Sequence, residues 1–325
     1  MSVIIPTYNR ARTIARSIES VFAQSFQDFE LILVDDCSKD NTAEIVRKWQ
    51  SDPRFRYIRH ESNRGAAGAR NTAIRAARTD YIAFLDSDDS WLPDKLNLQM
   101  QLLDKLGPAF GVVTGTMLRP QPGGGVMHCP WRYTLGADGV REVTFNHIAE
   151  QLFAHVQTIL VRRSDLEACG LIDEQLRASD DWDLLLRLAR QTRIADCGQP
   201  VTVAYYSTDR LTGRPELVIA DMTRILAKQA SWLPPRVAAH VAYIAALAAC
   251  ESGRFAQARA LAAQACVGDA SHRRAKFLRV VLSISPTLAR ALVSAVRRLR
   301  VWHRIAATAV AVRLPSSLFR GVRTY

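Results

Sequence analysis

The sequence predicts an α/β fold in which helices flank a mixed, mostly parallel sheet, followed by an α-helical carboxyl-terminal region. Short apolar segments alternate with segments of helical periodicity through the first half of the chain, and this alternation is typical of βαβ units. Of the 325 residues, 48% are hydrophobic and 23% are charged, as in ordinary globular proteins. After about residue 215 the strand-like segments give way to alanine-rich, basic sequence.

In the first half, four short apolar segments indicate buried strands and three longer segments have the spacing of helices. The strands are expected over residues 3–6, 30–34, 56–59 and 81–85, and the helices over 11–24, 42–50 and 66–77. Farther along, the same reasoning predicts strands at 112–113, 156–161 and 201–206 and a helix over 180–190. The Gly123–Gly125 run has no helix pattern after it and indicates a surface loop.

The last third of the chain is expected to be helical and basic. Residues 237–267 have the pattern of two alanine-rich helices joined at Ser252–Arg254, and a long helix is expected from Pro286. On that last helix Leu and Trp share one face and Arg the other, namely Leu288, Leu292, Leu299 and Trp302 against Arg290, Arg297, Arg300 and Arg304. This pattern fits a helix lying on an anionic membrane surface. It fits equally a helix docked on the rest of the protein, because periodicity does not distinguish lipid from protein.

The net charge and the cysteine content limit the classes of binding partner and the cellular compartment that we expect for this protein. Residues 220–325 carry a net charge of +14, whereas residues 1–219 carry −2. Such a basic tail attracts polyanions; nucleic acid is the less expected one, because few aromatic residues are interleaved with the basic ones. The six cysteines form no CxxC pair, which argues against a zinc site and against a disulfide framework. With no signal-peptide pattern and no apolar run of roughly 18–20 residues, we expect a cytoplasmic protein, either free or peripheral on the cytosolic face of a membrane.

The stretch FLDSDD, residues 84–89, begins at the end of the expected strand 81–85 and is the most informative motif. Side chains alternate along a strand, so Asp86 and Asp88 face the same side and can converge on one small, hard cation. Mg²⁺ or Mn²⁺ suits such a site, because it takes few carboxylates and completes its shell with phosphate oxygens and water. An EF-hand loop does not fit, since Trp91 stands where Gly is needed and Asn97 where Glu is needed. A structural alternative, in which Asp89 or Ser90 caps the helix beginning near residue 93, leaves Asp86 and Asp88 unexplained.

Three further polar motifs follow expected strand or loop ends, where ligands of α/β sheets bind. They are Pro6–Arg10, the pair Asp35–Asp36, and Asn63–Asn71 with its small residues and Arg70. The first and the third have ordinary structural explanations, a turn and close helix packing. A helix cap at Asp40 or Asn41 would explain the residues after the pair but leaves Asp35 and Asp36 themselves unexplained. A helix amino terminus rich in small residues also attracts anions, and Arg70 is placed either to contact a phosphate or to hold the nearby Asp residues.

Taken together in this order and spacing, PTYNR, VDDCSKDNT, NRGAAGARN and FLDSDD closely resemble the inverting family-2 glycosyltransferases with a GT-A fold, over about residues 1–215. The resemblance implies transfer of a sugar from a nucleotide-diphosphate donor to an acceptor hydroxyl, with Mg²⁺ or Mn²⁺ as cofactor. It places Pro6, Thr7, Tyr8 and Asp36 at the nucleobase, with Arg70 supporting that pocket. It places Asp86 near the ribose and Asp88 on the metal, with Asp89 assisting or ordering the loop.

A fifth motif, Ser179-Asp180-Asp181-Trp182-Asp183, is similar to the Glu-Asp-Trp-Asp segment of that family. The resemblance makes Asp181 the catalytic base, with Asp180 at the Glu position and Trp182 on the acceptor side. The structural alternative is a helix start, where Asp complements the helix dipole. One departure concerns the His that many relatives carry after the last strand, because residues 206–210 contain none. In the family this His is a further contact to the metal or the phosphate. Asp209 or Arg210 would then take its place, or the metal would rely on Asp88 and the diphosphate.

We therefore expect a catalytic domain over residues 1–215 and a basic helical region over 216–325. The expected acceptor is a glycan or lipid-linked molecule of cell-surface polysaccharide or glycolipid synthesis. The alternative is a non-catalytic protein that keeps the GT-A fold and binds a nucleotide sugar or a polyanion. A nucleotidyltransferase of related fold is disfavoured, because Pro6–Arg10 is not the Gly-rich basic loop that its activation chemistry needs.

Overall fold

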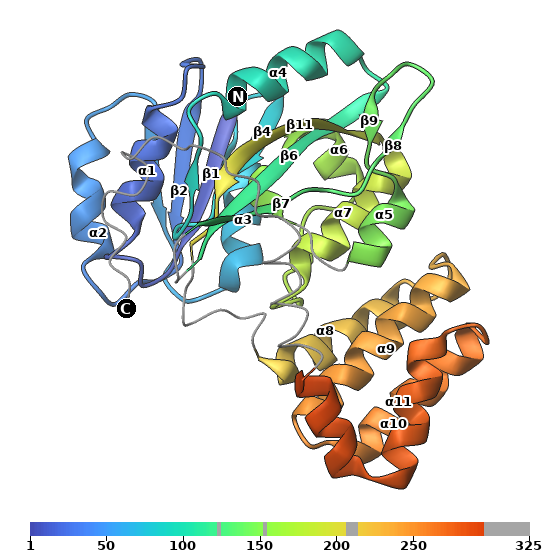
Figure 1. Ribbon diagram of the computed structural model, residues 1–325. Helices are drawn as coiled ribbons and strands as arrows, with labels where there is room; N and C mark the ends of the chain where they lie inside the picture. The colour runs from blue at the N-terminus through green and yellow to red at the C-terminus, as the bar shows by residue number, and fades with distance from the viewer. Residues whose placement is uncertain (122–124, 152–154, 206–213, 296–325) are drawn as a thin grey trace.

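The computed structural model describes residues 1–121, 125–151, 155–205 and 214–295. Helices cover both faces of a twisted sheet, and the helices after residue 214 lie together at one end of it (Figure 1). The sheet runs β3-β2-β1-β4-β10-β6-β11-β9-β8, with β5 paired to β11 and β7 to β6. Its strands are β1 Ser2–Thr7, β2 Glu30–Asp35, β3 Phe55–Arg59, β4 Tyr81–Phe84, β5 Ser90–Trp91, β6 Phe110–Pro120, β7 Val126–Cys129, β8 Thr134–Leu135, β9 Arg141–Glu142, β10 Leu160–Arg162 and β11 Arg193–Val203.

The sheet is mixed, as predicted. Strands β3, β2, β1 and β4 are mutually parallel, and β10 lies antiparallel between β4 and β6. All six residues of β1 are buried, as expected of a parallel strand covered on both faces. Because side chains alternate along the strand, Ile4 packs into the core on one face while Val3 and Ile5 pack into the core on the other.

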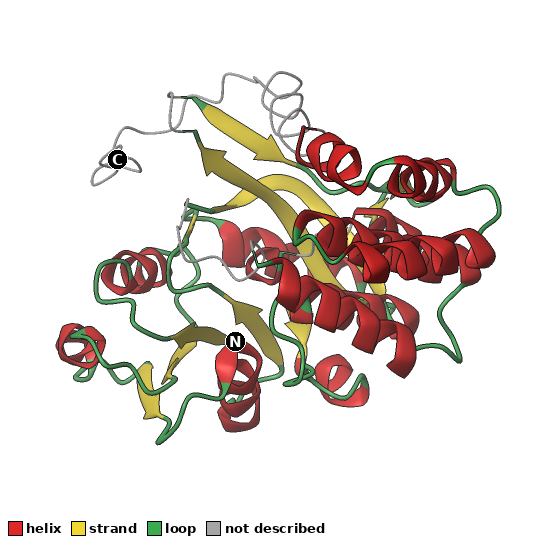
Figure 2. Ribbon diagram, turned by 90° about the horizontal axis from the view of Figure 1, so that it is seen from below, coloured by secondary structure: helices red, strands yellow, loops and turns green. Residues whose placement is uncertain are grey.

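The helices divide between the two faces of the sheet (Figure 2). The core that contains Val3 and Ile5 is closed by α1 and α4, and the core that contains Ile4 is closed by α3 and α7. The latter core continues into the carboxyl-terminal helices. The helical elements are α1 Ile14–Phe22, α2 Thr42–Ile45, η1 Val46–Trp49, α3 Gly65–Ala76, α4 Lys95–Leu106, α5 Phe145–Gln151, η2 Val156–Thr158, α6 Arg163–Ala168, α7 Asp180–Gln191, α8 Pro215–Lys228, α9 Pro235–Glu251, α10 Phe255–Gly268 and α11 Arg273–Ile284.

The first-half strands and the helices near 11–24, 66–77 and 180–190 are confirmed to within a few residues. The segment 156–161 is wrong as a single strand, because residues 156–158 form the 3₁₀ turn η2. The carbonyl of Gln157 in that turn accepts hydrogen bonds from Trp91 Nε1 and Thr202 Oγ1, each at 3.0 Å, so side chains rather than a neighbouring strand hold it. The last strand also begins earlier than predicted, at residue 193, since β11 carries register shifts around Pro200 that break its alternation.

The predicted pair of alanine-rich helices is confirmed as α9 and α10, joined at Ser252–Arg254. The helix expected from Pro286 is described through residue 295, so Arg297, Leu299, Arg300, Trp302 and Arg304 lie outside the described residues. Of the Gly123–Gly125 run, only Gly125 is described, after β6 and before β7. Within the described ranges, no helix combines the length and the apolar character needed to cross a bilayer.

Candidate active site

The candidate site lies at the carboxyl ends of β1, β2 and β4. The parallel register pairs Thr7 at the end of β1 with Asp35 at the end of β2, and β4 on the other side of β1 leads into Asp86. The helix α3 begins beside these strand ends, since the amides of Arg64 and Gly65 bond to Asp36. The helix α7 begins at Asp180, which shares the guanidinium of Arg70 with Asp86. The motifs around residues 6–10, 35–36, 63–71, 86–89 and 179–183, which are far apart in sequence, therefore meet at one edge of the sheet, where open α/β sheets bind ligands.

At the end of β1, Tyr8 is the exposed member of the predicted nucleobase group. Pro6 and Thr7 are buried within β1, whereas Tyr8 is 41% exposed. The loop behind Tyr8 is fixed by Asn9, whose side-chain oxygen accepts from the amide of Lys39 at 2.8 Å. An aromatic face presented on a fixed loop can stack on a base, whereas the expected contacts of Pro6 and Thr7 with a nucleobase stay predictions.

Asp36 seats the amino terminus of α3. Its carboxylate accepts hydrogen bonds from the amides of Arg64 at 2.8 Å and Gly65 at 2.7 Å, and it lies 2.7 Å from His60 Nδ1. Gly65 has φ of 81°, a left-handed conformation that favours glycine. The Asp36 carboxylate thus complements the positive end of the helix dipole. Its expected contact with a nucleobase stays a prediction, and the contacts in the structure are those of a group that holds the loop before α3.

The neighbouring Asp35 is wholly internal. It accepts from the amide of Ser38 at 2.8 Å and from the hydroxyl of Tyr57 at 2.7 Å. Burial and the adjacent carboxylate of Asp35 raise the pKa of Tyr57, so this hydroxyl keeps its proton and donates it. Asp35 therefore orders the loop 35–38, while the side chains that can meet a ligand lie on either side of it.

Arg70 joins the two halves of the site. Its guanidinium donates to Asp86 Oδ1 at 2.7 Å and to Asp180 Oδ2 at 2.7 Å, and the residue is only 6% exposed. Burial alone would lower the pKa of Arg70, but the carboxylates of Asp86 and Asp180 outweigh it and raise that pKa. Of the two placements left open by the sequence, the structure shows the one in which Arg70 holds nearby Asp residues. The loop after β4 and the start of α7 are thereby fixed to each other.

Asp181 is the acid of this cluster that is poised to accept a proton. It lies at the start of α7, and its Oδ1 accepts from the amide of Trp182 at 2.8 Å. Burial, followed by the negative charge of Asp180, raises the pKa of Asp181 well above its ordinary value; Arg70 partly offsets this and Asp86 adds to it. A carboxylate with a raised pKa is a stronger base once ionised, which is the property that a general base needs.

Trp182 and the helical region hold the start of α7 in place. The Trp182 indole is buried and donates to the carbonyl of Ile148 in α5 at 2.9 Å. From α8, the buried carboxylate of Asp221 accepts from the amides of Arg177 at 3.0 Å and Ala178 at 2.7 Å, immediately before the motif. Residues after 215 therefore brace the loop that presents Asp180 and Asp181.

Asp88 and Asp89 take different positions in the loop after β4. Asp89 is buried, and its carboxylate accepts from the amide of Tyr205 at 3.0 Å and from Gln157 Nε2 at 3.1 Å. It therefore orders the loop, which was one of its two expected roles. The expected cap at Asp89 or Ser90 is wrong: α4 begins at Lys95 with Asp94 as its N-cap, because the chain first forms β5 at residues 90–91.

Two arginines to which the sequence analysis assigned no role lie beside Asp88. Arg10 Nη2 is 3.7 Å from Asp88 Oδ2, and Arg16 donates to the carbonyl of Asp88. The guanidinium of Arg16 also stacks on the ring of Tyr205, 3.6 Å from its centroid. Both arginines lie within ten residues of the end of β1. The run of basic residues Arg10, Arg12 and Arg16 is the sequence pattern that could have indicated them. A diphosphate beside Asp88 would meet this positive charge.

The side chains present fit a divalent cation shared with a ligand rather than one held by protein alone. The described residues contain no group of three or more His, Cys, Asp or Glu side chains that could hold a metal ion. The carboxylates of Asp86 and Asp88 are nevertheless partly open, at 30% and 25% side-chain exposure. One or two carboxylates completed by phosphate oxygens and water are the usual set for Mg²⁺. The His-free segment 206–210 lies outside the described residues.

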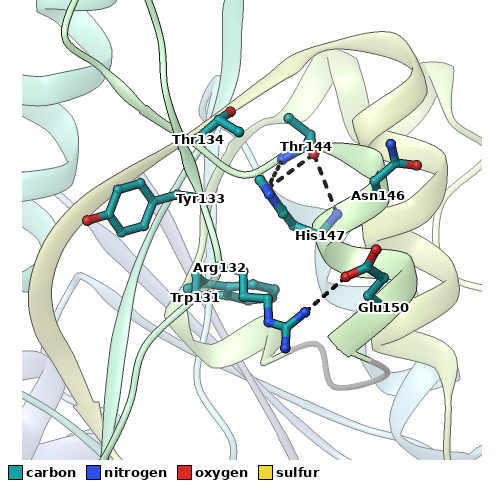
Figure 3. A pocket seen from close by; sticks show the side chains of 8 residues that line it. All are labelled: Trp131, Arg132, Tyr133, Thr134, Thr144, Asn146, His147 and Glu150. Atoms are coloured by element: carbon teal, nitrogen blue, oxygen red, sulfur yellow. Dashed lines mark hydrogen bonds and ion pairs between the residues drawn. The ribbon is translucent and has the colours of Figure 1, made fainter.

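A pocket of about 680 Å³ lies between residues 131–134 and α5. Its wall combines aromatic and polar side chains, shown in Figure 3. Tyr133 is 42% exposed, and an ion pair between Arg132 and Glu150 at 2.9 Å spans the rim. Thr144 and His147 also line the pocket, and the Thr144 hydroxyl lies 3.1 Å from His147 Nδ1. The carbonyl of Ile148, in the same helix as His147, accepts a hydrogen bond from Trp182. The helix that lines the pocket is therefore hydrogen-bonded to the start of α7.

A mixed α/β sheet with a cluster of carboxylates and arginines at its carboxyl edge defines a nucleotide-binding class of protein. Within that class the assignment is specific: the family model described as glycosyl transferase family 2 matches residues 2–164, half of the chain. The chain belongs to glycosyl transferase family 2.

Among curated relatives, the UDP-Glc:alpha-D-GlcNAc-diphosphoundecaprenol beta-1,3-glucosyltransferase WfgD of Escherichia coli is 44% identical over 110 residues, which are 34% of this chain and 43% of WfgD. The chain spans about half the length of the first curated relatives it matches, from 43% to 54%.

Two solved structures share the fold. Residues 1–349 of S. aureus TarS in complex with UDP-GlcNAc superpose with a TM-score of 0.62 at 21% identity, covering 92% of this chain and 91% of that one. The mannosyltransferase PcManGT of Pyrobaculum calidifontis, in complex with GDP-Man and Mn²⁺, superposes with a TM-score of 0.51 at 20% identity, covering 90% and 85%. At these identities the likeness establishes a GT-A fold.

Proposed function

We propose that this protein is an inverting glycosyltransferase that moves a sugar from a nucleotide-diphosphate donor to an acceptor hydroxyl. The observation that carries the proposal is the Arg70 bridge, which holds Asp86 of the donor-side loop and Asp180 of the acceptor-side helix within 2.7 Å of one guanidinium. In this proposal Asp181, with its raised pKa, would lie beside the position where donor and acceptor meet. Family membership and the donor complexes of TarS and PcManGT support the same assignment.

In this mechanism Asp181 removes the proton from the acceptor hydroxyl. The acceptor oxygen then forms a bond to the anomeric carbon of the donor sugar, on the face opposite the leaving group. The bond from that carbon to the diphosphate breaks, and the nucleoside diphosphate leaves with the electron pair. Such a displacement inverts the configuration, and the proton remains on the Asp181 carboxyl until solvent takes it.

The donor would lie along the edge formed by β1, β2 and β4. Tyr8 would stack on the base, with Asp36 shaping that end of the pocket and Asp86 facing the ribose. Arg10 and Arg16 would face the diphosphate beside Asp88. Mg²⁺ or Mn²⁺, bound through Asp88 and the diphosphate, would stabilise the negative charge that grows on the leaving group.

The acceptor would approach from the side of the pocket beside α5. Its exposed Tyr133 ring and the polar groups of Asn146 and Glu150 suit a saccharide, which offers apolar ring faces and many hydroxyls. We infer a glycan or lipid-linked acceptor of cell-surface polysaccharide synthesis, met at the cytosolic face of a membrane. The substrate in the name of WfgD, alpha-D-GlcNAc-diphosphoundecaprenol, supports this class.

The test is a screen of UDP-, GDP- and dTDP-sugars with Mn²⁺ or Mg²⁺, read first by thermal shift and then by release of nucleoside diphosphate in the presence of candidate acceptors. A stabilising donor that also turns over supports the proposal. Binding without turnover across the acceptor panel, including undecaprenyl-diphosphate sugars, would favour the non-catalytic alternative. No binding of any nucleotide sugar would overturn both.

A further inference from the structure

The helix α11, Arg273–Ile284, has one face that packs against the protein and one that does not. Its inner side chains Leu278, Val281 and Leu282 are buried. Arg259 of α10 donates to the carbonyl of Leu282 at 2.7 Å, and the ring of His272 lies 4.9 Å from that of Tyr243 in α9. The helix is therefore anchored along its length, and the orientation of its outer face is fixed.

Three large apolar side chains occupy that outer face. Phe277 is 63% exposed, Val280 56% and Ile284 75%. Their spacing of i, i+3 and i+7 places them in one narrow stripe. Of the nine large hydrophobic side chains that are exposed among the described residues, five lie between positions 277 and 292, the other two being Leu288 and Leu292 of the helix that follows. Scattered single apolar residues are normal on a surface, but a stripe of this kind marks an interaction site.

The charges around the stripe indicate what it meets. Arg273 precedes Phe277 by one helical turn, Lys276 precedes Val280 by one turn, and both basic residues are exposed, as are Arg274 and Arg279. Beyond Asp269 the sequence contains twelve Lys and Arg residues and no Asp or Glu. A partner must therefore offer negative charge and apolar volume together. The headgroup layer of an anionic bilayer has both, with acyl chains directly beneath the charges.

We propose that α11 is a membrane-docking helix that lies flat on an anionic lipid surface. Phe277, Val280 and Ile284 enter the boundary between headgroups and acyl chains, and Arg273 and Lys276 bind lipid phosphates on the flank of the stripe. This surface is distinct from the leucine and arginine faces that the sequence indicated beyond residue 286. It is independent of the sugar-transfer chemistry, since it shares no residue with the candidate active site.

The experiment is co-sedimentation of the full chain with vesicles of phosphatidylcholine and phosphatidylglycerol in equal parts, compared with vesicles of phosphatidylcholine alone. The expected result is binding to the anionic vesicles that weakens with added salt. The triple variant Phe277→Gln, Val280→Gln and Ile284→Gln is expected to lower the partition coefficient at least tenfold. Val267→Gln, at a side chain that is 87% exposed on α10, is the matched control and is expected to bind like the wild type.

A second variant tests the charged flank. Arg273→Gln with Lys276→Gln is expected to lower the partition coefficient by on the order of fivefold for each charge removed. All of these positions are exposed and glutamine is a good helix former, so the helix content measured by circular dichroism is expected to stay unchanged. Affinity for a nucleoside diphosphate is measured in parallel, so that a failure of the docking helix is distinguished from a failure of the active site.

Two outcomes would overturn the proposal. Anionic-vesicle binding that is equal in the wild type and the triple variant would mean that another part of the chain binds the lipid. A wild type that is dimeric by light scattering, with a monomeric triple variant, would mean that a second copy of the chain covers the stripe.

Discussion

The guanidinium of Arg70 lies 2.7 Å from the carboxylate of Asp180, a residue 110 positions later in the chain. The same guanidinium holds Asp86 at 2.7 Å. Each of these groups would be costly to bury alone, and removal of one member leaves the others without compensation. The site is therefore a single charged unit, and changes to its members are expected to be coupled.

Replacing Arg70 tests this unit directly. Arg70→Met is expected to lower the free energy of unfolding by about 3 kcal/mol, because two carboxylates lose their buried partner. Arg70→Lys is expected to cost less, since it keeps the charge but not the two-sided contact. Urea denaturation measures both. Arg75→Met on the same helix, whose exposed side chain lies 3.8 Å from Glu174, is the control and is expected to change stability by less than about 1 kcal/mol.

Asp181→Asn is expected to abolish sugar transfer while the affinity for the donor nucleotide stays within about twofold, because the amide keeps the shape but takes up no proton. Transfer is followed by release of nucleoside diphosphate, and affinity by calorimetry. Asp104→Asn, at an exposed position of α4, serves as the control and is expected to leave both unchanged. Transfer that survives in Asp181→Asn would remove this residue as the base.

The pH dependence of the rate is expected to follow the raised pKa of Asp181. Transfer needs the ionised carboxylate, so the rate is lost as the pH falls through that pKa, at a higher pH than an ordinary aspartate would give. In Asp180→Asn a neighbouring negative charge is removed and Arg70 is freed to stabilise the Asp181 anion. The acid limb of the profile is therefore expected to move to lower pH. A limb that stays in place or moves upward would contradict this electrostatic account.

Stability is expected to rise with pH because of Lys95. Burial lowers the pKa of this side chain to about 7, and its ammonium contacts are Gln99 Oε1 at 2.6 Å and the carbonyl of Ile159 at 3.3 Å. Between about pH 7 and 10.4 the unfolded chain binds this proton more tightly than the folded one. The free energy of unfolding should thus increase across that window, by up to about 1.4 kcal/mol per pH unit.

This prediction is tested by how the free energy of unfolding changes with pH in the wild type and in Lys95→Met. The absolute stabilities are not compared, since Lys95→Met also leaves two acceptors without their donor. The variant is expected to lose the upward slope between about pH 7 and 10. Lys105→Met, at an exposed position of the same helix, is expected to keep the slope. Parallel slopes in the wild type and Lys95→Met would show that this lysine titrates normally.

Cation binding is expected to depend on nucleotide. Asp88 is a partly open carboxylate with Arg10 beside it, and the described residues hold no group of three metal-ligating side chains. Mn²⁺ alone should therefore bind weakly, and a nucleoside diphosphate should strengthen binding by supplying oxygen ligands. Titration calorimetry of Mn²⁺ with and without UDP measures the difference. Asp88→Asn is expected to remove most of the nucleotide-dependent gain. Tight Mn²⁺ binding in the absence of nucleotide would contradict the shared site.

Much of the first half could be predicted because its signals are local. The apolar segments ending in Thr7, Asp35 and Phe84 are short, uninterrupted and followed by polar motifs, and each became a strand of the parallel group. The strand β11 was predicted only in part, because its register shifts replace simple alternation. The stripe on α11 was missed for a similar reason: a helix of mixed composition does not reveal which of its apolar residues are covered until its neighbours are placed.

For the candidate site, the sequence alone determined which residue types collect at the strand ends and the family resemblance that they carry. Only the tertiary structure decided what each side chain touches. It turned Asp36 toward the start of α3, enclosed Asp89 in its loop, and placed Arg70 between Asp86 and Asp180. The physical reason is that a carboxylate's pKa and partners depend on burial and on charges brought together by folding across more than a hundred residues, which no local pattern encodes.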